Sequence, residues 1–288
     1  MLADIAQLAL NGLVAGVLLA VPAIGLTTVF AVLRFPNFAI SAHATIGAFA
    51  GYLANVTFGL PAPLALVLAF MAAGAFGVAS DELALKPMRP HGALPTAIAS
   101  IALTLVLENV VRFAFGNEIR GYDLPVFRDW RFGALHLGPQ QAENAALAVA
   151  AMIAVFAFLA FTRAGKAMRA VADNPTLADL KGIDPLKVAR AANFTGMGLA
   201  GAGGMLLGLD TSIDPLTGFR ALLPVFAAAV LGGLGSIPGA VLGALVVGLA
   251  EELSLIAIAP TYRTAIGFLA ILLTLTIRPR GILGERAY

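Results

Sequence analysis

The sequence predicts an all-α polytopic membrane protein, and three observations lead to that prediction. Only 12% of its 288 residues are charged, whereas soluble domains carry about 25%. Its mean hydropathy is +0.92. Long stretches hold no Asp, Glu, Lys or Arg, and a bilayer core requires about 20 apolar residues per helix. We therefore expect a single transmembrane domain over 1–288, built as a bundle of about eight to ten membrane-spanning helices.

Charge-free runs place the spans along the chain. The first run covers 5–33, and the second, 35–80, is long enough for two spans. Gly59 and Pro61 predict a break within the second run. The N-terminus lacks the basic start of a signal peptide, so we expect no cleaved leader. The remaining apolar segments bring the expected total to about nine crossings; they are 94–115, 144–162, 189–209, 221–237, 240–258 and 264–277.

Basic loops predict the orientation, because Lys and Arg accumulate on the cytoplasmic side of a membrane. Nine crossings then place the N-terminus outside, and the segment 116–142, which has no excess of positive charge, becomes an external segment. Basic residues are concentrated in the segment after the fifth span and in the C-terminal tail: Arg163, Lys166, Arg169, Lys181, Lys187, Arg190, Arg278, Arg280 and Arg286.

The segment 163–187 is an amphipathic, well-capped interruption of the apolar sequence. Lys166–Asp173 predicts a short helix, and Asn174 followed by Pro175 predicts the start of a second one. Gly182 predicts its left-handed end. Leu177 and Leu180 then share one helix face. From the residues alone, this cytoplasmic elbow is either a connector between spans or a helix that docks on a partner protein.

The sequence lacks the residues that several classes of function require. There is no cysteine, and His43, His91 and His136 lie far apart, so we expect no metal site. No GxxxxGK[ST] motif is present, so we expect this chain to bind no ATP. No basic stripe predicts nucleic-acid binding. Residues 196–201 match GxGxxG without a preceding strand, which favours a glycine-rich membrane helix. We expect a protein that is not itself an enzyme.

Polar residues within the spans are the better functional candidates, because they are costly in lipid. Glu108 and Arg112 are four residues apart and are expected to pair on one helix face. Glu251 and Glu252 have Arg263 as their nearest basic residue in sequence. Such residues either line a polar path for a zwitterionic solute or sit at an outer helix end in water.

Three stretches carry a resemblance that covers nearly the whole chain: RAVADNPTLADLKGID at 169–184, AAAVLGGLGSIPGAVLG at 227–243 and RPRGILG at 278–284. The sequence resembles the branched-chain amino acid permease family of ATP-binding-cassette importers, and in particular the smaller permease subunit of the pair. The resemblance implies that the elbow seats on an ATPase subunit. The coupling residues it implies are Arg169, Asp173, Asn174, Leu177, Leu180 and Gly182.

The resemblance also implies partners and a solute. The partners would be a homologous second permease, two cytoplasmic ATPases that hold ATP and Mg, and an external solute-binding protein, all at a bacterial inner membrane. The solute would be a branched-chain or hydrophobic amino acid, with urea, short amides and aromatic acids as alternatives. Glu108 stands where the family often has a neutral amide. The expected path residues are Asn11, Asn37, Glu108, Asn109 and Glu251.

An ion-coupled carrier that works alone is the second function class. Such carriers bind their ion at broken helices near the middle of the membrane. Pro22 and Pro224 could break helices, yet the sequence places no acidic cluster beside either of them. The importer permease is therefore the favoured interpretation.

Overall fold

The computed structural model describes residues 2–124, 128–133, 135–278 and 280–284, and these residues are almost wholly helical. Short 3-10 or π turns are η1 (Leu53–Thr57), η2 (Asp81–Leu85), η3 (Lys86–His91) and η4 (Pro260–Tyr262). Strands β1 (Trp130–Phe132) and β2 (Leu135–Leu137) form an antiparallel hairpin. The α-helices are α1 (Leu2–Leu33), α2 (Ile40–Tyr52), α3 (Ala62–Ser80), α4 (Ala93–Phe115), α5 (Pro139–Phe161), α6 (Arg163–Asp173), α7 (Pro175–Leu180), α8 (Pro185–Asp210), α9 (Thr217–Gly232), α10 (Ile237–Ser254) and α11 (Arg263–Ile277).

The apolar segments of the sequence coincide with helices. Five helical stretches in the described residues are long and apolar enough to cross a membrane, namely α1, α3 with η2 and η3, α4, α5 and α10. Helices α9 and α11 are shorter apolar helices. The break expected near Gly59 and Pro61 is confirmed, since η1 ends at Thr57 and α3 begins at Ala62. The chain is an all-α polytopic membrane protein.

Helix α8 forms the centre of the bundle, where it packs against α1, α2 and α3. Its glycines make this possible: a methyl group on Gly201 or on Gly47 of α2 would overlap the opposite helix. Similarly, a methyl group on Gly16 would lie 2.8 Å from the Cα of Leu245 in α10. Small residues allow close backbone contact where lipid provides no hydrophobic driving force, so these glycines hold the bundle together.

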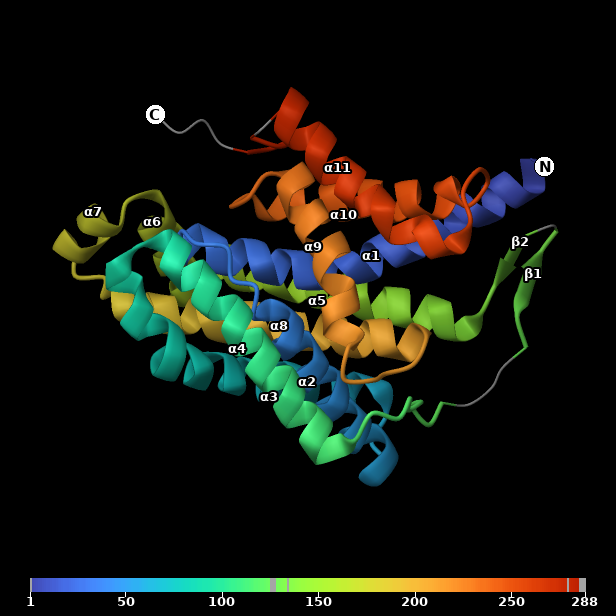
Figure 1. Cartoon of the computed structure of the whole chain (residues 1–288), viewed down its shortest axis with the longest axis horizontal. Helices are drawn as coiled ribbons and strands as arrows, with labels where there is room; N and C mark the ends of the chain where they lie inside the picture. The colour runs from blue at the N-terminus through green and yellow to red at the C-terminus, as the bar shows by residue number, and fades with distance from the viewer. Residues whose placement is uncertain (1, 125–127, 134, 279, 285–288) are drawn as a thin grey trace.

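Different segments lie at the two ends of the long axis of the bundle (Figure 1). Helices α6 and α7 project at one end of the long axis, where Arg34 after α1 donates a hydrogen bond to the carbonyl of Ala172. The β1–β2 hairpin and the N-terminus lie at the other end, where Gln7 donates to the carbonyl of His136 at 2.9 Å. We call these the α6–α7 end and the hairpin end.

Charge divides between these two ends. Among the described residues, six Lys and Arg lie between Arg163 and Arg190, in α6, just after α7 and at the start of α8, whereas the described part of 116–142 has three Arg and three acidic residues. The basic tail residue Arg286 lies outside the described residues. The positive-inside rule predicts that the α6–α7 end faces the cytoplasm.

The described part of the expected external segment 116–142 gathers at the hairpin end. Arg120 and Ile213 exchange backbone hydrogen bonds, each at 2.8 Å. The Tyr122 hydroxyl donates to the carbonyl of Ala48 at 2.8 Å. Burial raises the pKa of the Tyr122 phenol above its usual range, so the hydroxyl keeps the proton that it donates. These bonds hold the segment over the ends of α2 and α8.

Candidate functional site

Helices α6 and α7 owe their positions to side-chain caps. The Asn174 Oδ1 accepts the N–H of Leu177 at 2.9 Å, with Pro175 at the first helical position. Gly182 ends the turn after α7 with φ of +82°. Both features confirm the prediction from sequence. Helix α6 begins at Arg163 rather than Lys166, because the Thr162 Oγ1 accepts the N–H of Gly165 at 3.0 Å and caps the helix earlier.

The outer face of this elbow carries two exposed leucines among charged residues. Met168 and Val171 of α6 and Ala178 of α7 are buried against the bundle. Leu177 and Leu180 point the other way and are 52% and 80% exposed. The predicted coupling residues all lie on the exposed side of the elbow: Arg169, Asp173, Asn174, Leu177, Leu180 and Gly182. Exposed leucines beside charged residues are typical of a protein docking surface.

Helix α4 carries a stripe of polar side chains, the α4 polar stripe, which consists of Thr96, Ser100, Thr104, Glu108 and Arg112. Residues four apart lie on one helix face, and the first four of these are buried. The sequence analysis selected Glu108 and Arg112 and missed the three hydroxyl residues. The regular spacing of four was present in the sequence and would have identified them.

The stripe binds the chain that leads into α2. The Ser100 Oγ accepts the N–H of Phe38 at 3.0 Å, and the Thr104 Oγ1 donates to the Phe38 carbonyl at 3.1 Å. The Phe38 ring stacks on Phe226 of α9 with centroids 4.8 Å apart. The α4 polar stripe, the start of α2 and α9 therefore meet here. The buried Asn37 accepts the Ala39 N–H at 3.1 Å and stabilises this turn.

Glu108 and Arg112 do not form the predicted ion pair. Glu108 is 4% exposed, and its Oε1 has no hydrogen-bond partner within the part of the chain that the structure describes. The Arg112 Nε is also buried without a hydrogen-bond partner there. No N–O approach between these two side chains falls within 4.0 Å, although one helical turn separates them.

The other expected path residues do not join Glu108. Asn11 accepts a 3.0 Å hydrogen bond from Gln7 near the hairpin end. Glu251 is buried at the same end of α10 and approaches Arg263 at 3.4 Å, so it is neither free nor in open water. Asn109 lies on the exposed face of α4, where its Nδ2 donates to the Leu105 carbonyl at 2.7 Å. Asn37 lies just before α2 and Glu108 lies on α4, and these two helices pack against each other.

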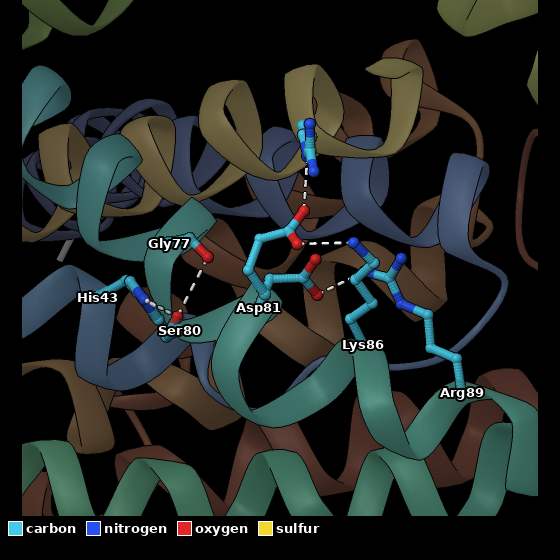
Figure 2. Close-up of polar contacts among 8 residues, drawn as sticks. His43, Gly77, Ser80, Asp81, Lys86 and Arg89 are labelled. Carbon is cyan, nitrogen blue, oxygen red and sulfur yellow. Dashed lines mark hydrogen bonds and ion pairs between the residues drawn. The ribbon is translucent and has the colours of Figure 1, made fainter. Parts of the chain in front are cut away.

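A second charged group, missed by the sequence analysis, lies at the α6–α7 end of α3. This inner ion cluster consists of Asp81, Glu82, Lys86, Arg89 and Arg190. Asp81 pairs with Arg89, and Figure 2 shows both beside Lys86 at the turn after α3. Glu82 accepts from Lys86 at 2.6 Å and from Arg190 of α8 at 2.5 Å. The cluster joins η2 and η3 to α8.

His43 and Ser80 form a separate contact beside the inner ion cluster. The His43 Nε2 lies 3.0 Å from the Ser80 Oγ (Figure 2). The His43 Nδ1 lies 2.7 Å from the Ala39 carbonyl, so both ring nitrogens have protein partners. Within the described residues, no group of three or more His, Asp or Glu side chains has the geometry to hold a metal ion. These contacts tie α2 to α3.

The sequence is similar to known transport proteins over almost its whole length. Residues 8–275 match the family described as branched-chain amino acid transport system / permease component. The high-affinity branched-chain amino acid transport system permease protein LivH of Escherichia coli K12 is 32% identical, over 96% of this chain and 94% of the relative. The corresponding BraD of Pseudomonas aeruginosa is 31% identical, over 97% and 95%.

A more distant relative and a solved structure extend these similarities. The probable LivH permease of Methanocaldococcus jannaschii is 30% identical over 93% of this chain and 89% of the relative. The fold resembles that of a chain in PsaBC from Streptococcus pneumoniae in complex with Fab, with a TM-score of 0.50, 12% identity and 97% coverage of both chains. By its sequence over nearly its full length, the chain belongs to the permease component family of branched-chain amino acid transport systems.

Proposed function

We propose that this chain is the permease subunit of an ATP-binding-cassette importer and forms part of the path for branched-chain or hydrophobic amino acids. The observation that carries the proposal is the capped elbow of α6 and α7, which presents Leu177 and Leu180 at the most basic end of the bundle. Membership of the permease family supports the amino-acid solute.

The proposed partners follow from this assignment. Two cytoplasmic ATPases dock on the elbow and hold the ATP and Mg, and this chain hydrolyses nothing itself. A homologous second permease completes the membrane part, and an external binding protein delivers the solute at the hairpin end. The assembly lies in the inner membrane of a bacterial cell.

The contacts of the elbow suggest how ATPase closure reaches the path. Helix α6 packs against α1, α5 and α8, and α7 leads directly into α8. Helix α8 packs in turn against α2 and α3. A displacement of the elbow therefore moves the central helix, and with it α2 against the α4 polar stripe. The solute path in this proposal runs along that stripe.

Uptake by the assembled transporter tests the proposal. The full-length chain is purified from its own host with the proteins that bind it, reconstituted in vesicles and supplied with ATP at the ATPase side. Labelled leucine should accumulate only with ATP, and urea, a short amide and an aromatic acid should not. Preferential uptake of one of those three would reassign the solute. Uptake by this chain alone, driven by an ion gradient, would instead show that it is an ion-coupled carrier.

A further inference from the structure

We propose that Glu108 and Arg112 together form a receptor for the charged head group of a zwitterionic α-amino acid. Glu108 binds the α-ammonium group, and Arg112 binds the α-carboxylate. The inference rests on the proposed function and assigns the part of the path that recognises the solute. The geometry that points to it is a buried Glu108 carboxylate and, one helical turn along the same face, a half-buried Arg112 guanidinium. Within the described residues, the Glu108 Oε1 and the Arg112 Nε have no hydrogen-bond partner.

Glu108 differs from the other buried carboxylates of the described residues. Asp81 pairs with Arg89, and both Glu251 and Glu252 pair with Arg263. Glu108 has no cation within 4.0 Å, although it is as buried as the others. A buried charge without a partner is strongly unfavourable. The fold therefore pairs its buried acids, with Glu108 as the described exception, and a ligand group would complete the site.

The spacing of the two residues fits a zwitterion. Residues four apart on a helix have side chains about 5–6 Å apart at Cβ. An α-amino acid carries its ammonium and carboxylate on one carbon atom, so both charges can be met by one such pair. The planar guanidinium of Arg112 suits a carboxylate, which it can bind through two parallel N–H donors. Glu108 offers only acceptors when ionised, which suits an ammonium group.

The surroundings of the pair suit an apolar side chain. One turn below Glu108, Thr104 binds the Phe38 backbone, and the Phe38 ring stacks on Phe226. On the other side, Val111 packs with Ala48 and Phe49 of α2. A solute held by Glu108 and Arg112 thus has aromatic and aliphatic groups within reach of its side chain. Urea or a short amide has no separated charges to match the pair, so the site favours hydrophobic amino acids over neutral amides.

Access to the pair requires α4 to move from α2. Helix α4 packs mainly on α2, η2 and η3, and its outer face of Leu105, Val106, Val110 and Phe113 is exposed. It lies at the edge of the bundle in front of α2 and α3 (Figure 1). The inner ion cluster connects η2, at the base of α4, to α8. In this proposal, motion of α8 is passed through the cluster to the base of α4 and opens the stripe.

Ligand-dependent thermal stability tests the receptor directly. The permease–ATPase complex is purified without its external binding protein and melted with leucine, leucinamide or 4-methylpentanoate. Leucine should raise the midpoint of thermal unfolding. Leucinamide, which lacks the carboxylate, and 4-methylpentanoate, which lacks the ammonium group, should not raise it at equal concentration. Glu108→Gln and Arg112→Gln each remove one hydrogen-bonded charge. Each variant should therefore need about 10- to 100-fold more leucine than the parent to give the same rise in the unfolding midpoint.

Matched controls separate recognition from folding. Glu118→Gln and Arg131→Gln make the same chemical changes at exposed positions and should respond to leucine like the parent. Glu108→Asp keeps the charge and should retain a weaker response. A full leucine response in both Glu108→Gln and Arg112→Gln would overturn the receptor. If the receptor proposal fails in this way but the parent complex imports leucine with ATP, the proposed importer function still holds. If the parent complex imports only urea or amides, both the receptor and the proposed amino-acid importer are wrong.

Discussion

Leu177 and Leu180 present apolar side chains to the exterior at the α6–α7 end, whereas Glu108 holds a charge among the buried residues of α4, one turn from the half-buried Arg112. Both sites are incomplete in the isolated chain, but each lacks a different kind of partner. Exposed leucines at a charged end are completed by another protein surface. Buried unpaired charges are completed by polar or charged ligand groups. This difference distinguishes the proposed coupling surface from the proposed solute path.

The elbow should give the largest effect when its apolar face is broken. Burying a Leu contributes about 1.5 to 3 kcal/mol, so Leu177→Asp with Leu180→Asp should weaken docking by several kcal/mol once charge desolvation is added. The bundle should stay folded, because both side chains are exposed. Co-purification of the ATPases with the tagged chain measures the loss. Thr176→Asp, which adds charge without removing a leucine, should retain them.

An elbow variant that still bound its ATPases would show that the elbow is not the docking surface. If the double Asp variant bound ATPase and transported normally, α6 and α7 would be only a connector between spans. The docking surface would then lie at another turn of the same end, around Lys86–Gly92 or Gly232–Gly239.

The inner ion cluster should lose stability when one partner is removed. Arg89→Gln leaves the buried Asp81 carboxylate without its guanidinium, and breaking a buried pair in this way costs about 3–5 kcal/mol. The thermal unfolding midpoint in detergent should fall. Adding Asp81→Asn to Arg89→Gln should recover much of the loss, because no uncompensated charge then remains. A double variant less stable than Arg89→Gln alone would contradict this account.

Glu108→Gln should act in the opposite direction on stability. This change removes an unpaired buried charge and keeps the shape of the side chain, so the ligand-free protein should be as stable or more stable, by up to about 1–3 kcal/mol. Melting curves of the ligand-free parent and variant show whether the unfolding midpoint rises or falls. A marked drop in the midpoint would show that Glu108 already has a protein partner that stabilises the fold.

Glu82→Gln should give the smallest change. Glu82 bonds to Lys86 and Arg190, but it is 29% exposed and Arg190 is 51% exposed, so water and salt screen both pairs. The midpoint should fall less than in Arg89→Gln, and high salt should reduce the difference from the parent. A fall as large as that of Arg89→Gln would place Glu82 in an environment like that of Asp81.

The helices and the elbow could be predicted from the sequence because their determinants are local. Charge-free length fixes the spans, and Asn174, Pro175 and Gly182 fix the elbow through contacts within a few residues. Thr162 was missed as the cap of α6, although it stands only one residue before the helix. Helix caps can be predicted from a sequence because the hydrogen-bond donor and acceptor are close together in the chain.

The environments of the expected path residues could not be predicted from the sequence, because they depend on contacts between helices distant in sequence. Asn109 and Glu108 are neighbours in the chain, yet one is exposed and the other buried. The burial of Glu251 depends on packing of α10, α9 and α11. The Asp81–Arg89 pair depends on the π turn η2 and the 3-10 turn η3, which bring side chains eight residues apart together. Such pairings follow from the fold rather than from spacing alone.

Thiol labelling inside the α4 polar stripe tests most directly whether this stripe lines the solute path. The chain contains no cysteine, so Thr104→Cys gives a single reporter, and Val110→Cys on the exposed face of α4 gives the control. During ATP turnover of the reconstituted transporter, a small hydrophilic thiol reagent should react at position 104, and leucine should slow that reaction without affecting position 110. A thiol at position 104 that stays unreactive throughout turnover, or that reacts equally with and without leucine, would contradict the account.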